Sequence, residues 1–174
     1  MVYGKKGQNL DFKELYTMYA TKVLAICYRY TRDYETAKDL THDTMIRVMQ
    51  NAHKYRGENN SSIYSWIRRI AINLSIDYIR KTKAPDISPK DEDLALIPEQ
   101  LTESILNVPR SALKSMIDSL PHTQRLIINM FCIDGYTHKE IAERLGITEK
   151  TSSSLLAKAK RKMNSKIESY LKTH

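Results

Sequence analysis

The residues best suited to chemistry in this chain are hydroxyl and cationic side chains near its C-terminal end. They comprise a hydroxyl run, Thr151-Ser152-Ser153-Ser154, and the basic residues behind it, Lys158, Lys160, Arg161 and Lys162. Hydroxyl groups donate hydrogen bonds to base edges and phosphates or accept them, and lysine and arginine neutralise phosphates. The pattern predicts a DNA-reading surface with the hydroxyl run exposed in front. For the lysine-rich part, a merely solvated face is the alternative.

The segment around this surface has the pattern of a helix-turn-helix. A first helix is expected over 139–145 and a second from Glu149, with Gly146 taking the positive φ that ends the first. Thr148 is a suitable N-cap for the second helix, which would enter the DNA major groove. The expected inward positions of the first helix and the turn are Ile141, Ala142, Leu145 and Ile147, and the candidate apolar positions of the second helix are Leu155, Leu156 and Ala159, of which the two leucines need not both be buried. An ordinary helical hairpin is the alternative.

A catalytic site is not indicated. The nearest group is Asp39, His42 and Asp43, which lie within about one turn of an expected helix and could hold a cation. The chain offers no glycine-rich phosphate loop and no nucleophile–base pair. Cys27 and Cys132 lie in separate apolar runs and form no zinc motif. The sequence therefore predicts no enzyme, no cofactor and no metal, with a metal-dependent nuclease as the remote alternative.

Three segments of the N-terminal half have apolar residues at the spacing of amphipathic helices. These are residues 10–30, 34–52 and 63–81. The second is less regular, with Ile46 and Met49 among its apolar positions. A polar loop precedes the third, and Ser62 is its expected N-cap.

Residues 82–110 read as a linker, because their first part, residues 82–98, contains three prolines and an acidic run. Their net charge is −3, between a block of +6 before them and a block of +5 after them. Two basic blocks favour two surfaces that face a polyanion, although lysine that merely aids solubility is an equal alternative on charge alone. The expected fold is all-α, with two small helical bundles joined by a flexible linker and a helix-turn-helix in the C-terminal bundle. The expected domains are 8–81, 82–110 and 111–172.

Cellular location follows from two expected absences. The first residues lack the apolar core of a signal peptide, and no apolar stretch approaches the ~20 residues that span a bilayer. We therefore expect a protein of the reducing cytoplasm.

Three further stretches stand out, namely ETAKDLTHDTMIRV, SSIYSWIRRIAINLSIDYIRK and DSLPHTQRLIINMFCIDGYTHKEIAERLGIT. Taken in order, they resemble the extracytoplasmic-function (ECF) group of bacterial RNA polymerase sigma factors. The first is similar to an acidic helix of the family's first domain, and the second to its melting and recognition helix. The third is similar to the helices that lead into the recognition helix of the second domain. Each stretch alone is weak evidence, but the ordered set with an acidic linker is specific.

The resemblance implies a role for each group. Asp39, His42 and Asp43 would face the polymerase clamp, with His42 where the family often has glutamine. A loop and the third helix would catch an extruded base of the −10 element and hold the unpaired strand. The residues implied there are Arg56, Asn59, Asn60, Ser61, Arg69, Asn73 and Arg80. Tyr55 and Tyr64 would stack on bases or fill the core, and Trp66 is expected in the core.

The resemblance also places the −35 contacts on the recognition helix. The matching residues are Thr151, Ser153, Ser154, Lys158, Lys160 and Arg161. Many members have basic residues where this chain has Ser153 and Leu155, so a different upstream element is expected. The implied partners are core RNA polymerase, through the clamp of its largest subunit and the flap of the second, promoter DNA, and an anti-sigma factor attached to the membrane. The rival hypothesis is a helix-turn-helix regulator that needs no polymerase, for which residues 34–81 would have no use.

Overall fold

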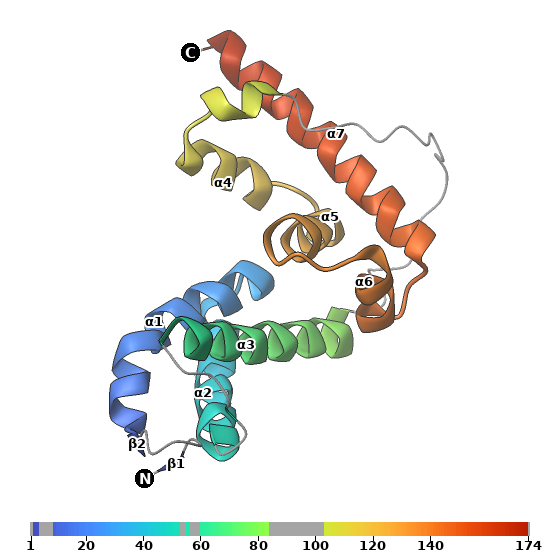
Figure 1. Ribbon diagram of the computed structural model, residues 1–174. Helices are drawn as coiled ribbons and strands as arrows, with labels where there is room; N and C mark the ends of the chain where they lie inside the picture. The colour runs from blue at the N-terminus through green and yellow to red at the C-terminus, as the bar shows by residue number, and fades with distance from the viewer. Residues whose placement is uncertain (1, 4–8, 53–54, 56–59, 84–102, 174) are drawn as a thin grey trace. The chain divides into compact units, whose positions relative to one another are not determined.

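The chain is described by a computed structural model that covers residues 2–3, 9–52, 55, 60–83 and 103–173 (Figure 1). It divides into two units, Met1–Thr82 and Lys83–His174. The expected all-α class is confirmed, with one small addition. Two-residue strands β1 (Val2–Tyr3) and β2 (Asn9–Leu10) pair antiparallel before the first helix. The predicted linker prolines lie outside the described residues.

The first unit consists of three helices, α1 (Phe12–Thr31), α2 (Tyr34–Asn51) and α3 (Asn60–Lys83). Aspartates start the first two. Asp11 accepts a hydrogen bond from the Lys13 backbone N–H at 3.0 Å, and Asp33 accepts one from the Thr36 N–H at 2.8 Å. Such N-caps satisfy backbone donors that a helix start leaves without partners.

The start of α3 corrects the sequence prediction. The helix begins at Asn60 and not after Ser62, so Asn60 and Ser61 belong to its first turn and not to the preceding loop. Asn and Ser are unfavourable in the interior of a helix but are favoured at its N-terminal end. A helix start at Asn60 and a helix start after Ser62 therefore both fit the local sequence. Arg56 and Asn59 lie outside the described residues, as do the side chains of Asn60 and Ser61.

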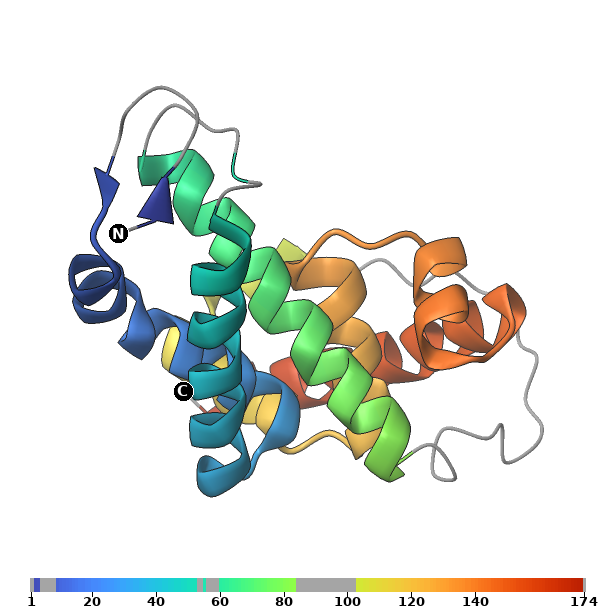
Figure 2. The same ribbon diagram turned by 90° about the horizontal axis from the view of Figure 1, so that it is seen from below.

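The core of this unit lies where α3 crosses α1 and α2 (Figures 1 and 2). Cys27 of α1 is fully buried there, beside the hydroxyl groups of Ser75 on α3 and of Thr41 and Thr44 on α2. The three hydroxyls donate to the carbonyl oxygens four residues before them, at 2.6–2.8 Å. Each of these buried hydroxyls therefore has a partner, as a close-packed interior requires.

The second unit is entirely helical in its described part. Its elements are η3 (Glu103–Asn107), α4 (Arg110–Asp118), α5 (His122–Ile128), η4 (Asn129–Ile133), α6 (His138–Leu145) and α7 (Glu149–Thr173). The segment between Pro121 and Gly135 does not form one continuous α-helix. It instead widens into the π-helical turn η4, in which the Asp134 N–H bonds the Asn129 carbonyl at 3.0 Å. Gly135 follows with φ +77°, which ends the helix.

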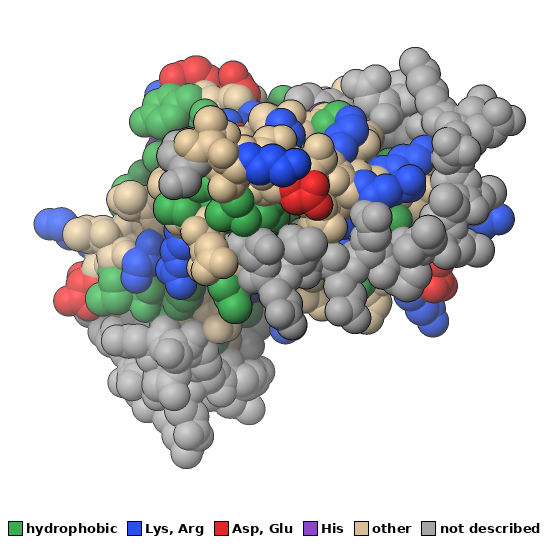
Figure 3. Space-filling model, turned by 90° about the horizontal axis from the view of Figure 1, so that it is seen from above, with side chains coloured by type: hydrophobic (Ala, Val, Ile, Leu, Met, Phe, Trp, Pro, Cys, Tyr) green, Lys and Arg blue, Asp and Glu red, His purple; other side chains and the backbone are tan. Residues whose placement is uncertain are grey.

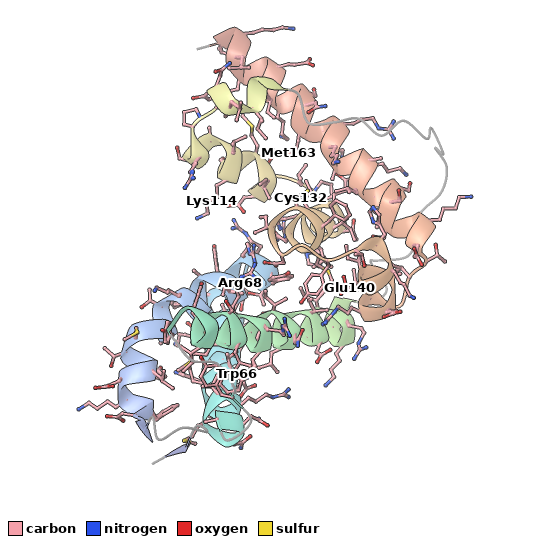
Figure 4. The ribbon with its side chains drawn as sticks, in the orientation of Figure 1. Trp66, Arg68, Lys114, Cys132, Glu140 and Met163 are labelled. Carbon is pink, nitrogen blue, oxygen red and sulfur yellow. The ribbon has the colours of Figure 1, made fainter. Side chains whose placement is uncertain are left out.

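Helix α7 is the element on which the second unit assembles. Its buried residues are Ser152, Leu156, Ala159, Met163 and Ile167. These recur every three or four residues and form one stripe, against which α4, α5 and α6 pack. Met163, labelled in Figure 4, lies on this inner side. The opposite sides of α7 are left for other contacts.

Candidate nucleic-acid and polymerase interfaces

The turn between α6 and α7 is built by local hydrogen bonds. Thr137 and Glu140 form a capping box at the start of α6, in which the Glu140 carboxylate accepts from the Thr137 backbone N–H at 2.8 Å. These hydrogen bonds favour the ionised carboxylate and lower the pKa of Glu140. Gly146 ends α6 with φ +70°, and Thr148 accepts from the Thr151 N–H at 3.0 Å. The predicted turn and both of its signals are confirmed.

The six predicted −35 residues occupy the sides of α7 that its buried stripe leaves open. At 3.6 residues per turn, Ser154 and Arg161 lie opposite the stripe. Ser153 and Lys160 lie on one flank, and Thr151 and Lys158 lie on the other. Ser153 is exposed, and the other five side chains are half-buried. The result is a helix with an apolar inner side and hydroxyl and cationic groups on its remaining sides.

Ser152 does not belong to this exposed front. It is fully buried, and its Oγ lies 2.9 Å from Nδ1 of His138 on α6. The His138 ring stacks on Phe131 of η4, with centroids 4.6 Å apart and an interplanar angle of 22°. Burial lowers the pKa of His138, and the nearby positive charge of Lys160 lowers it further. The expectation of four exposed hydroxyls was therefore wrong at one position, and sequence reasoning missed His138 altogether.

The predicted −10 residues of α3 share one side of that helix. Arg69, Asn73 and Arg80 follow each other at intervals of four and seven residues, which brings them onto one face. Arg69 and Arg80 are exposed and Asn73 is half-buried. Asp77 lies on the same face, with its carboxylate 3.4 Å from the Arg80 guanidinium. The four side chains give this part of α3 two cationic groups, one amide and one carboxylate along about three turns of helix.

The aromatic residues at the start of α3 and just before it pack within the unit. Tyr55 is buried and lies against Trp66, with ring centroids 5.5 Å apart. Tyr64 stacks on Tyr19 at 5.7 Å, and the Lys22 ammonium lies 5.4 Å from both of those rings. Trp66, labelled on α3 in Figure 4, is half-buried. These contacts are those of core and boundary residues.

Helix α2 presents a third exposed face. Asp39, His42 and Asp43 are all exposed, within about one helical turn. Ile46 and Met49 continue the same face and are 45% and 41% exposed, although the sequence pattern suggested that they belonged to the core. Where the structure describes the chain, no three His, Cys, Asp or Glu side chains lie close enough to hold a metal ion. The face is therefore an acidic surface with an apolar end.

Positive charge is widespread on the molecule as a whole. The chain carries a net charge of +8, and on the face drawn in Figure 3 the Lys and Arg side chains extend more widely than the Asp and Glu side chains. Across the described residues, no helix is long and apolar enough to cross a membrane. Two helical units, a helix-turn-helix and cationic helix faces are the features of a DNA-binding protein.

Comparison with known proteins identifies the family. The family model for sigma-70 region 2 matches residues 15–84, and the model for sigma-70 region 4 matches residues 110–163. The chain belongs to the ECF RNA polymerase sigma factors. It is a factor of transcription initiation, with regions 2 and 4 binding promoter elements, and sigma factors are subunits without catalytic activity of their own. The resemblance drawn from the three stretches is confirmed.

Individual relatives agree with this assignment. ECF sigma factor SigW of Bacillus subtilis is 30% identical over 157 residues, which cover 82% of this chain and 81% of SigW. SigE of Mycolicibacterium smegmatis is 27% identical over 92% of this chain, but the match spans only 63% of the length of SigE. A solved complex of the sigma factor RpoE with the anti-sigma factor NepR from Bartonella quintana covers 91% of this chain and 97% of the solved chain. Its TM-score of 0.49 and identity of 19% are too low to add to the assignment.

Proposed function

We propose that this chain reads a −35 element with α7, holds the opened −10 element with α3 and docks on the polymerase clamp with α2. The observation that carries the proposal is the two-sided character of α7. One side is buried within its own unit, and the others present hydroxyl and cationic groups at the end of a helix-turn-helix. Such a helix has the chemistry to enter a major groove and contact both bases and phosphates.

At the upstream element, the hydroxyl groups of α7 make the contacts that recognise bases. Ser153 and Ser154 present short side chains that suit close or water-mediated contacts with base edges. The Thr151 hydroxyl already lies 2.9 Å from that of Thr148, so part of its hydrogen-bonding capacity serves the turn. Lys158, Lys160 and Arg161 provide phosphate contacts, which hold the register of the helix without reading sequence. We therefore expect firm binding with modest sequence discrimination.

At the downstream element, the face of α3 holds the unpaired strand. Arg69 and Arg80 contact phosphates, and Asn73 hydrogen-bonds an extruded base. The preceding segment, with Arg56, Asn59, Asn60 and Ser61, forms the wall of the base pocket. The ring contacts of Tyr55 and Tyr64 within the first unit favour a supporting role over base stacking.

The acidic face of α2 is the proposed clamp contact. Asp39 and Asp43 supply charge, His42 a hydrogen-bonding ring, and the exposed Ile46 and Met49 an apolar end of the kind that strengthens a protein interface. In this assignment, residues 8–81 bind the clamp and the −10 element, and residues 111–172 bind the flap and the −35 element. Residues 82–110 connect these two domains. An anti-sigma factor that covers both units is the expected inhibitor, and the cytoplasm is the place of action, because the polymerase and the promoter are there.

Reconstitution with purified core polymerase tests the proposal. The full chain should co-migrate with core and direct run-off transcription from a subset of fragments in a genomic library. Variant Arg69→Ala/Asn73→Ala should still co-migrate but should lose open-complex formation, detected by permanganate reactivity of unpaired thymines. Glu168→Gln, an exposed position on α7, serves as the control. A chain that neither binds core nor starts transcription would refute the proposal.

A further inference from the structure

His138 and Ser152 form a polar contact between the two helices of the helix-turn-helix. Ser152 is the buried residue closest to the N-terminus of α7, and the other buried residues of that helix begin one turn later at Leu156. Its hydroxyl is fully buried and meets the His138 ring at 2.9 Å. A buried hydroxyl that lost this partner would be left in an apolar setting, which is unfavourable.

This contact differs in kind from the rest of the α7 interface. Leu156 and Ala159 make apolar contacts, whose energy depends on packing and not on the direction of a bond. A hydrogen bond depends in addition on direction, because it weakens steeply once its angle falls below about 120°. The contact therefore constrains the rotation of the first turns of α7 about the helix axis.

The His138 ring is itself held from a second element. The π-helical turn η4 carries Phe131, whose ring lies over the imidazole at a centroid distance of 4.6 Å. Ser153 and Thr151 flank Ser152 at about 100° on either side. Any rotation at Ser152 therefore moves the reading hydroxyls by the same angle.

We propose that His138 is a positioning residue for promoter reading, which sets the rotation of the first turns of α7 and thereby the selectivity of Ser153 and Ser154 at the upstream element. This inference rests on the proposed function of α7. His138 does not touch DNA in this scheme, and its effect passes through Ser152. Its loss should reduce discrimination between upstream sequences and should change binding to unselected DNA much less.

The test uses holoenzyme assembled from core polymerase and full-length chains. Wild-type holoenzyme first selects duplexes from a library in which only the upstream element is randomised. The measured quantity is the ratio of affinities for the selected and a scrambled element on one downstream sequence. The variants are Ser152→Ala, His138→Phe, the double variant, and His138→Asn, whose amide can replace Nδ1. Ser165→Ala, an exposed serine of α7, is the matched control.

Ser152→Ala and His138→Phe should each lower the selectivity ratio roughly three- to tenfold, the range expected for one hydrogen bond. The double variant should lose no more than either single variant, because both remove the same contact. His138→Asn should retain most of the selectivity, and Ser165→Ala all of it. Should His138→Phe fail to fold, Ser152→Ala, which removes a single oxygen atom, decides the question.

Wild-type selectivity in folded Ser152→Ala and His138→Phe would overturn the inference while the proposed function stands. So would losses that add in the double variant, because additivity would mean two unrelated packing defects. A wild-type holoenzyme that shows no preference for any upstream sequence would refute the proposed function of α7, and the inference would fall with it.

Discussion

Replacement of Lys158 and Lys160 by glutamine tests quantitatively whether α7 lies in a DNA groove. The two residues lie about 160° apart around the helix axis, one on each flank of the surface opposite the buried stripe. A helix seated in the major groove has a phosphate backbone on each side. Each lysine should therefore face a different strand, and their contributions should be independent.

The magnitude follows from counterion release. Each neutralised phosphate contributes about 0.9 to the slope of log affinity against log salt concentration. Each single variant should thus lower the slope by about 0.9, and the double variant by about 1.8. Over a fourfold rise in salt from about 50 to 200 mM, the affinity deficit of the double variant should shrink by roughly 12-fold.

Fluorescence anisotropy of holoenzyme with a duplex that carries only the upstream element measures these slopes. Core polymerase is kept in excess so that its association with the chain does not limit binding. Lys172→Gln, an exposed lysine at the far end of α7, removes the same charge away from the expected contact and should leave the slope unchanged. Equal slopes for wild type and the double variant would refute the placement of α7 in the groove.

Other expected results concern the clamp face, the core and the turn. Asp43→Lys should weaken association with core polymerase by roughly tenfold at low salt, mainly through a slower association rate, whereas Glu168→Lys should not; stopped-flow mixing measures both. Ile141→Ala, at a fully buried position, should destabilise the second unit by about 2–5 kcal/mol in urea titration. The pKa of His138 in the folded chain lies below its ordinary value of 6.5. The neutral His138 ring therefore stabilises the fold fully above pH 6.5, and this stability is lost as the pH falls below 6.5 through the folded pKa. His138→Asn should remove this pH dependence.

The turn of the helix-turn-helix was readable from the sequence because its signals are local. Gly146 and Thr148 act through their own backbone and their nearest neighbours, so residue type alone indicates where α6 ends and α7 begins. The capping box of Thr137 and Glu140 is equally local and lengthens α6 by one residue relative to the expected start. Both helices of the motif follow from these short-range preferences.

The burial of Ser152 could also be predicted from the sequence, but only from the angular spacing of residues around a helix. Four consecutive residues of a helix span about 300° of its circumference, so a run of four hydroxyls cannot all face outward. Ser152 precedes Leu156 by four residues and Ala159 by seven, which places it on the buried stripe. Its partner His138 could not be deduced, because that contact depends on how α6 crosses α7.

Other differences arise from tertiary context. Ile46 and Met49 satisfy a helical apolar pattern, yet they are exposed because no described element of the first unit covers that side of α2. The π-helical turn η4 has no simple sequence signature, since one widened turn differs from an α-helix by a single hydrogen-bond register. Composition and spacing thus predict which elements form more reliably than they predict which faces meet.

The two cysteines allow the opening of the first helical unit to be followed by thiol modification. Cys132 is exposed in the second unit, whereas Cys27 is fully buried in the first. A maleimide should therefore modify Cys132 in the native protein and reach Cys27 only when the first helical unit opens. The mass increase counts the modified thiols, so pulsed alkylation measures the opening of that unit, free or bound to polymerase, without any introduced label.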